Sequence, residues 1–307
     1  GPRFVAKLDL VHRLADGRRL GYCEYGDYDG LAIVALHGTP GSRYKFGVAD
    51  QEARRLGLRL ISPDRWGYGL SDAPAGKPGL AAYAADIAEL ARALKLSRFG
   101  VVGISGGGPY AVALATQMAE CVDALALVAP VAPVSEAEER DGVSLFHRFA
   151  FRGLPRVPGA VSLAFLYFRG VLSVSPWWAA RTMAARAGPP DRVLLAQAEV
   201  RDDLARTFLA GLASGVRGAS MDMGYFSRDW RLDFDAIKMP ARMWLGGQDR
   251  NVPLPAARML ANRLETLDLI EIADAGHFWV TKHYPQVLEW LRATLSERSD
   301  WRPNTAS

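Results

Sequence analysis

The sequence has few cysteines. Cys23 and Cys121 are the only two in 307 residues, which is too few for a disulfide framework. Neither their spacing nor neighbouring histidines suggest a metal site, and each lies in an apolar, strand-like segment. We therefore expect two buried free thiols, which fits a reducing cytoplasm.

The sequence also lacks a dense block of charge and a long apolar run. Its 37 Lys and Arg are spread among 33 Asp and Glu, for a net charge of +4, so we expect no nucleic-acid partner. The most apolar long stretch, Gly159 to Ala180, is interrupted by Arg169, Gly170 and Pro176. A membrane span is therefore not expected.

The first residues show no charged-then-apolar signal pattern. Gly1-Pro2 resembles the remnant of a cleaved purification tag, so a signal peptide removed earlier stays open. The expected location of the protein is the cytoplasm. The sequence does not decide whether the protein forms a homodimer.

Short runs rich in Val, Ile and Leu alternate with helical patterns, which is typical of a mostly parallel sheet flanked by helices. The predicted strands are residues 8–14, 19–25, 31–36, 58–62, 99–104, 122–128, 241–245 and 267–272. The first two form an antiparallel pair joined by the turn at residues 15–18. The predicted helices between and after these strands are residues 80–94, 106–119 and 285–295.

Between Pro133 and Arg231 the periodicity is helical throughout, with prolines 155, 158, 176, 189 and 190 marking breaks. The sequence thus predicts an α/β sheet domain in two parts, residues 1–132 and 232–307, separated by a helical insertion at residues 133–231.

A candidate nucleophile follows the predicted strand 99–104. Gly103-Ile104-Ser105-Gly106-Gly107 fits the pattern G-x-S-x-G between a strand and a helix. So tight a turn strains the backbone, and small residues two before and two after Ser105 avoid clashes. The helix N-terminus that follows favours developing negative charge. Because the nucleophile is Ser rather than Asp, epoxide opening and halide displacement are disfavoured.

A candidate base and acid follow the last two predicted strands. His277, in the loop after residue 272, can take the serine proton and return it to a leaving group. Asp249, after Leu245, can accept the Nδ1 hydrogen of that histidine and leave Nε2 free. Asp274 is the competing acid, ranked lower because acids so near in sequence usually cap the loop.

The loop Leu36-His37-Gly38-Thr39-Pro40-Gly41-Ser42 follows the first buried strand. An oxyanion hole needs two backbone amides aimed at one point. Pro40 has no amide hydrogen, so Thr39 is the expected donor, with Gly106 as the second. His37 is expected to hold the loop by hydrogen bonds.

Through this His-Gly-x-Pro loop, the Gly-x-Ser-x-Gly segment and the Asp249 and Gly276-His277 positions, the chain resembles the α/β-hydrolase superfamily. The segment Pro63 to Ser71 is similar to the family's D-R-x-G-x-G-x-S stretch, which usually buttresses the site. The resemblance spans about residues 8 to 295 apart from the insertion, which looks like the family's variable helical cap. It implies the chain order Ser, Asp, His and a reaction without metal or organic cofactor.

The insertion is rich in large apolar side chains, most of which are expected to pack against its own helices or the sheet domain. These are Phe146, Phe149, Phe151, Phe165, Leu166, Tyr167, Phe168, Trp177 and Trp178. The remainder would line an apolar pocket for a small-molecule substrate. Gly38, Ile104, Tyr225 and Phe278 are the predicted substrate contacts, and Met221, Met223 and Phe226 are further candidates to face Ser105.

The expected activity is cleavage of an ester-like carbonyl bond in a small, largely apolar substrate, through an acyl-enzyme. Carbon–carbon bond hydrolysis and biosynthetic acyl transfer stay open. A proline iminopeptidase-like role would need acids for a substrate ammonium, for which Glu136, Glu138, Glu139 and Glu199 are available. A ligand receptor of the same fold, without turnover, is a further alternative.

Overall fold

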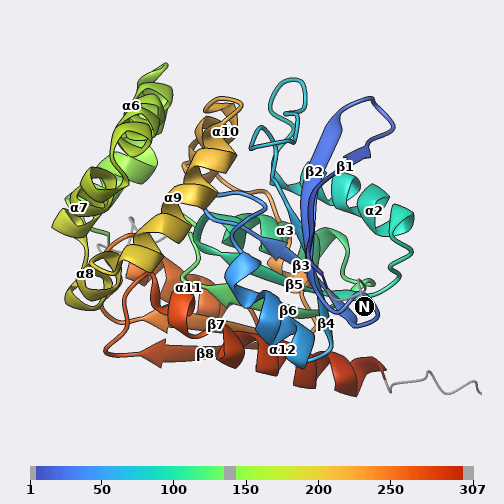
Figure 1. Ribbon diagram of the computed structural model, residues 1–307. Helices are drawn as coiled ribbons and strands as arrows, with labels where there is room; N and C mark the ends of the chain where they lie inside the picture. The colour runs from blue at the N-terminus through green and yellow to red at the C-terminus, as the bar shows by residue number, and fades with distance from the viewer. Residues whose placement is uncertain (1–4, 135–142, 300–307) are drawn as a thin grey trace, which may run out of the picture.

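The computed structural model describes residues 5–134 and 143–299, which contain one eight-stranded sheet (Figure 1). The strands are β1 (Lys7–Arg13), β2 (Arg19–Gly26), β3 (Leu31–Leu36), β4 (Leu58–Pro63), β5 (Phe99–Ile104), β6 (Val122–Val128), β7 (Ala241–Gly246) and β8 (Leu267–Ile272). Their order in the sheet is β1-β2-β4-β3-β5-β6-β7-β8. β2 runs antiparallel to β1 and β4, and all other neighbours are parallel. The predicted α/β architecture is confirmed.

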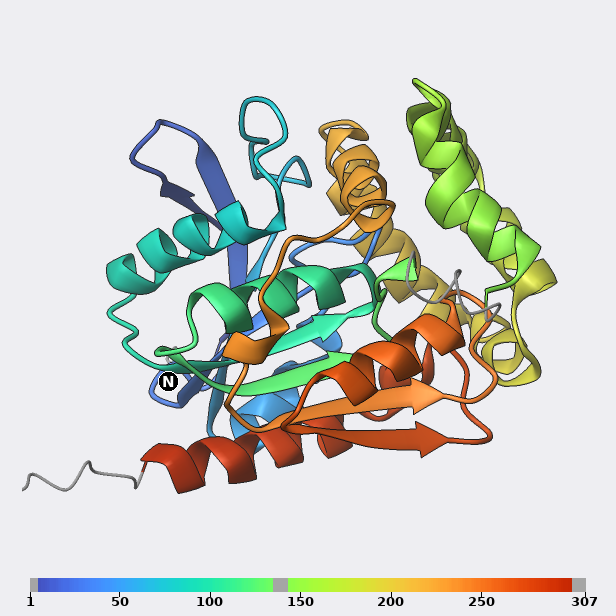
Figure 2. The ribbon, with the colours of Figure 1, turned by 180° about the vertical axis from the view of Figure 1, so that it is seen from behind.

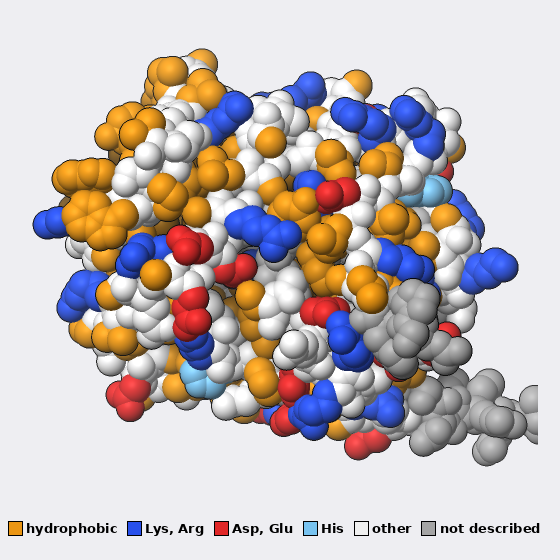
Figure 3. Space-filling model, in the orientation of Figure 1, with side chains coloured by type: hydrophobic (Ala, Val, Ile, Leu, Met, Phe, Trp, Pro, Cys, Tyr) orange, Lys and Arg blue, Asp and Glu red, His pale blue; other side chains and the backbone are white. Residues whose placement is uncertain are grey.

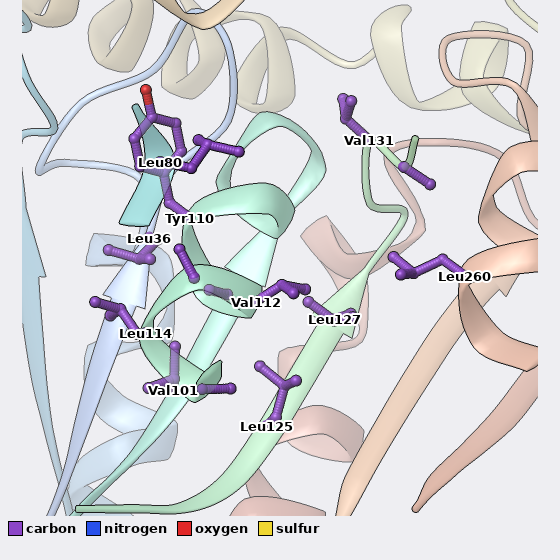
Figure 4. Close-up of a cluster of buried hydrophobic side chains, with 14 of the residues drawn as sticks. Leu36, Leu80, Val101, Tyr110, Val112, Leu114, Leu125, Leu127, Val131 and Leu260 are labelled. Carbon is purple, nitrogen blue, oxygen red and sulfur yellow. The ribbon is translucent and has the colours of Figure 1, made fainter. Parts of the chain in front are cut away.

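The central strands β5 and β6 carry one charged side chain, Asp123, and are otherwise apolar, because helices cover both faces of the sheet. All residues of β5 and β6 are buried, whereas the edge strand β1 is mostly exposed. On one face lie α1 (Asp50–Arg55) and α12 (Tyr284–Ser299). On the other lie α2 (Tyr83–Ala93), α3 (Gly108–Gln117) and α11 (Leu254–Arg263), and Figure 4 shows the core between α3, β5 and β6. Sequence analysis gave bounds for neither α1 nor α11, and the six residues of α1 are too few to establish a helical period.

Among the described residues, six α-helices, which we call the cap, separate β6 from β7. They are α5 (Leu145–Arg148), α6 (Ala160–Val174), α7 (Pro176–Arg186), α8 (Pro189–Leu195), α9 (Ala198–Leu212) and α10 (Arg217–Phe226). Pro176 and Pro189 stand in the first turns of α7 and α8, where a missing amide hydrogen costs no helical bond. The cap lies beyond the carboxyl ends of the parallel strands, with α9 between the sheet and the outer helices α6 and α7 (Figures 1 and 2).

The expectation that most large apolar side chains of the cap are packed away is wrong. Phe151 is buried, and Phe165 and Phe168 are partly buried, but the other six are exposed, Tyr167 by 74% and Trp178 by 57%. Four of them, Leu166, Tyr167, Trp177 and Trp178, belong to the outer helices α6 and α7, where hydrophobic side chains gather at the upper left of Figure 3. A layer of helices has two faces, and the sheet domain covers only the inner one.

The part of the chain that the structure describes holds no single helix of the length and apolarity that a membrane span requires. The segments Leu145–Arg156 and Ala160–Val174 reach that length only together, and they bend by 113° at the break between them.

Both cysteines are free, as expected from the sequence. Cys23 is buried, but Cys121 is only partly buried, because it lies at the turn just before β6.

Candidate active site

Ser105 lies at a sharp turn between β5 and α3. It opens a short 3-10 helix, Ser105–Gly107, and has a φ of +53°, a conformation that costs energy in a residue with a side chain. A methyl group on Gly103 would lie 2.5 Å from the carbonyl oxygen of Gly107, so no larger residue fits there. The steric argument made from the sequence agrees with this geometry, which presents the serine side chain at the carboxyl edge of the sheet.

His277 and Asp249 meet in loops that follow β8 and β7. The imidazole Nδ1 lies 2.8 Å from Asp249 Oδ2. The other carboxylate oxygen accepts the backbone amides of Asn251 and Val252, at 2.8 and 3.2 Å. Because both oxygens are engaged, the carboxylate is fixed in place, and with Nδ1 as the donor it leaves Nε2 of the imidazole free.

The competing acid, Asp274, lies exposed in the same loop as His277, whereas Asp249 is buried. Burial lowers the pKa of His277, but the charge and hydrogen bond of Asp249 outweigh that effect, so this pKa lies above its usual value. The contact with the imidazole therefore selects Asp249 as the partner of the histidine.

The loop after β3 lies against the turn that carries Ser105. A methyl group on Gly38 would lie 3.4 Å from Ser105 Cβ and 3.9 Å from the amide nitrogen of Gly106. A methyl group on Gly106 would lie 2.9 Å from the amide nitrogen of Thr39, so the two predicted oxyanion donors are neighbours in space. Gly106 lies in the first turn before α3, where backbone amides lack partners within the helix.

Below this loop lies a fully buried pair of side chains, His37 and Arg65. The backbone amide of Arg65 donates to His37 Nε2 at 3.1 Å, so His37 Nδ1 donates to the carbonyl oxygen of Gly38, at 2.7 Å. Burial and the nearby Arg65 charge keep the pKa of His37 well below its usual value, so the ring is neutral. The Arg65 guanidinium donates to the carbonyl oxygens of His37 and Gly38. His37 holds the loop, as the sequence suggested, and Arg65 does so as well.

Asp222, from α10 of the cap, pairs with Arg65 and was not singled out in the sequence. Its carboxylate accepts Arg65 at 2.7 Å, the Thr39 hydroxyl at 2.6 Å, and the hydroxyls of Tyr68 and Tyr110 at 2.6 and 2.7 Å. Burial and the Asp222 charge raise the pKa of both tyrosines, so their hydroxyls stay protonated and donate. A cap helix therefore helps to position Thr39 and its amide.

Asp191, at the start of α8, makes the corresponding contact on the histidine side. Its carboxylate accepts the backbone amides of His277 and Phe278, at 2.7 and 2.9 Å, and is fully buried. A methyl group on Gly276 would lie 2.3 to 2.4 Å from this carboxylate, so only glycine allows the approach. Burial raises the pKa of Asp191, and the two amides oppose that rise.

A cavity of about 320 Å³ connects the two sides of the site. Ser105 and His277 line it together with Gly38, Thr39, Ile104 and Phe278. The cap contributes Ala164, Phe165, Phe168, Met183, Leu204, Thr207 and Phe208, most of which are apolar. Three of the four predicted substrate contacts thus line the same cavity as the candidate nucleophile.

Tyr225, the fourth predicted substrate contact, lies elsewhere. It lines a second cavity of about 790 Å³, between the loop at residues 76–81 and α10, and its hydroxyl accepts the Gly79 amide at 3.3 Å. Met221 also lines that cavity, and Phe226 is buried in the core. The face of α10 turned to the loop of Thr39 carries Asp222, whereas Met223 packs against the hydrophobic core.

Asp191 and Asp222 left only weak signals in the sequence. Asp191 follows two prolines, where an acid is ordinary for a helix start. Asp222 lies between Met221 and Met223, so an acid in an otherwise apolar stretch was its one sign of burial. The residues that Asp191 and Asp222 contact lie far from them in the sequence, so no local sequence pattern could indicate these contacts.

Residues 33–289 match the alpha/beta hydrolase family. Over 251 residues the chain is 25% identical to the AB hydrolase superfamily protein YisY of Bacillus subtilis (strain 168), covering 81% of this chain and 85% of that protein. A match of 126 residues is 36% identical to a non-heme chloroperoxidase of Streptomyces lividans and covers 39% of this chain and 44% of that protein. The chain spans less than half the length of the curated relatives that it matches at 33–38% identity.

Among solved structures, a thermophilic esterase from Thermogutta terrifontis is similar in fold, with a TM-score of 0.67 and 21% identity, over 93% of this chain and 98% of that one. The family match runs from β3 into α12 and includes every strand and loop from which the site is built. The chain therefore belongs to the alpha/beta hydrolase family.

Proposed function

We propose that this protein is a serine hydrolase that cleaves an ester-like carbonyl bond through Ser105, His277 and Asp249. The observation that carries the proposal is the hydrogen bond between His277 Nδ1 and Asp249. His277 and Ser105 also line the same cavity. A histidine oriented by a buried carboxylate beside a serine at a strained turn is the arrangement that nucleophilic acyl transfer needs.

In the proposed reaction, His277 Nε2 takes the Ser105 proton as the serine oxygen attacks the carbonyl carbon. The Thr39 and Gly106 amides donate to the negative oxygen that develops. The imidazolium then protonates the leaving alcohol, and the acyl group stays on Ser105. A water molecule, deprotonated by His277, releases the acid by the same route.

The cavity lining favours an ester over a substrate with a free ammonium. Among the described residues that line the cavity shared by Ser105 and His277, there is no Asp or Glu, and there is one lysine. Glu199, an acid considered for an iminopeptidase, lies exposed and pairs with Lys282 at 2.6 Å. Glu136, Glu138 and Glu139 lie outside the described residues. Carbon–carbon cleavage and acyl transfer use the same groups and stay alternatives.

The test is labelling with a fluorophosphonate probe, together with turnover of p-nitrophenyl acetate and octanoate. We expect the wild type to label and to turn over, and Ser105→Ala and His277→Ala to lose both. Product analysis with added alcohol separates transfer from hydrolysis. A wild type that neither labels nor turns over contradicts the proposal and favours a receptor.

A further inference from the structure

Within the described parts of the chain, Lys45 is the one lysine or arginine that lines the cavity shared by Ser105 and His277. It belongs to the turn after the oxyanion loop, where its backbone amide donates to the carbonyl oxygen of Ser42 at 3.0 Å. The same cavity is lined by Ser105 and His277. A cation is thus part of an otherwise mostly apolar wall, beside the groups that would carry out the reaction.

The ammonium of Lys45 makes no hydrogen bond or ion pair within 4 Å with the residues that the structure describes. By contrast, the exposed ammonium groups of Lys238 and Lys282 each pair with a glutamate, at 3.3 and 2.6 Å. The charge of Asp203 on α9 raises the pKa of Lys45, but Asp203 is not part of the cavity wall. Burial lowers the pKa of Lys45 more than Asp203 raises it.

A half-buried cation without a partner loses part of its hydration, which costs free energy. A bound anion would offset that cost. We infer that the substrate of this site carries a carboxylate as well as the ester, and that Lys45 binds that carboxylate. This inference rests on the proposed ester hydrolysis. The substrate class is a half-ester of a dicarboxylic acid, or another ester with a negative charge at one end and an apolar middle for the cap phenylalanines.

The experiment compares esters that differ only in this charge. Mono-4-nitrophenyl glutarate, adipate and suberate are each measured beside the same compound with its free acid as a methyl ester. The three lengths vary the spacing between the ester and the carboxylate. For each length, the ratio of kcat/KM for the acid to that for its methyl ester reports recognition of the charge, independently of any general loss of activity.

We expect the wild-type ratio to exceed one at the best length and to fall by about tenfold to a hundredfold in Lys45→Met, through a rise in KM for the acid. Lys45→Arg keeps a charge and should restore part of the ratio. Lys238 is exposed and lies away from the site, so Lys238→Met should leave the ratio as in the wild type.

A second measurement does not depend on turnover. Calorimetric binding of monomethyl adipate to Ser105→Ala should weaken by a similar factor when Lys45→Met is added. If the esters turn over but Lys45→Met leaves the ratio unchanged, the carboxylate inference is overturned and the hydrolase proposal stands. If nothing turns over but binding depends on Lys45, the hydrolase proposal fails and the anion site remains. If monomethyl adipate binds equally well with and without Lys45→Met, the inference is also overturned.

Discussion

The sheet domain and the cap contribute different kinds of group to the site. The five groups that the proposed reaction uses follow strands of the sheet: Thr39 after β3, Ser105 and Gly106 after β5, Asp249 after β7 and His277 after β8. The cap supplies apolar walls and two buried carboxylates, Asp191 and Asp222. In the proposed reaction the sheet domain thus provides the reacting atoms, and the cap carboxylates hold the loops that carry them.

The two cap carboxylates also differ from each other. Asp222 faces a buried cation and three hydroxyls, so it belongs to an ion pair in the low-dielectric interior. Asp191, by contrast, accepts two backbone amides and no side-chain donor of the described residues. Removing the carboxylate charge should therefore lower the free energy of unfolding more at Asp222 than at Asp191, because it leaves Arg65 without its ion-pair partner. Changes in the sheet domain should abolish the reaction, and changes in the cap should weaken it by degrees.

The largest effect is expected from Asp249→Asn in the sheet domain. The amide would hold the wrong imidazole tautomer, so kcat should fall by about 10⁴-fold with KM little changed. The measurement is steady-state turnover of p-nitrophenyl acetate. Asp274→Asn is the matched control, because that acid lies exposed in the histidine loop, and it should retain nearly full activity. Equal losses in the two variants would refute the choice of Asp249.

Asp222→Asn should give the next largest effect and the greatest loss of stability. It leaves the buried Arg65 charge without its partner, which costs about 3–5 kcal/mol of unfolding free energy. A displaced Thr39 amide should lower kcat by about 10²-fold and leave KM nearly constant. Denaturant unfolding and steady-state kinetics measure both. The exposed Asp229→Asn is the control, and a stable, fully active Asp222→Asn would show that the cap does not position the oxyanion loop.

Asp191→Asn should have a smaller effect, because an amide oxygen can still accept one of the two backbone amides. The expected cost is about 1–3 kcal/mol of unfolding free energy, with about tenfold lower kcat. Asp202→Asn, exposed on α9, serves as the comparison. If Asp191→Asn costs more stability than Asp222→Asn, the contrast between the two carboxylates is reversed.

The pH dependence adds a readout that a purely structural role would not change. Because the base must be neutral and the pKa of His277 is raised, the acid limb of wild-type kcat/KM should lie above the ordinary imidazole value of about 6.5. The Asp191 charge contributes to that rise, so Asp191→Asn should move the limb to lower pH. An unmoved limb would mean that Asp191 acts on the loop geometry alone.

The smallest effect is expected from the cap wall. Phe165→Ala removes an apolar contact from the cavity, and the ratio of octanoate to acetate turnover should fall by about tenfold. Tyr167→Ala, two residues along α6 and 74% exposed, should leave the ratio unchanged. A change in the Tyr167 variant alone would place the acyl chain outside the cavity described above.

Much of this arrangement could be predicted because its signals are local. Apolar runs located all eight strands, and the motif around Ser105, with its neighbouring glycines, marked the turn. The order of Ser105, Asp249 and His277 along the chain, each after a strand, placed them at one edge of the sheet. Parallel strands in one sheet bring their carboxyl ends together whatever lies between them in sequence.

What only the tertiary structure decided concerns the helices. A helical period tells which positions share a face, but not which face meets the sheet domain and which meets water. It therefore could not foresee that Tyr225 turns away from Ser105, that Trp178 is exposed, or that Asp222 reaches Thr39 across 183 positions of the chain. The sequence determined the proposed reacting groups, because strand ends fix them, whereas the docking of the cap decided which side chains surround and hold those groups.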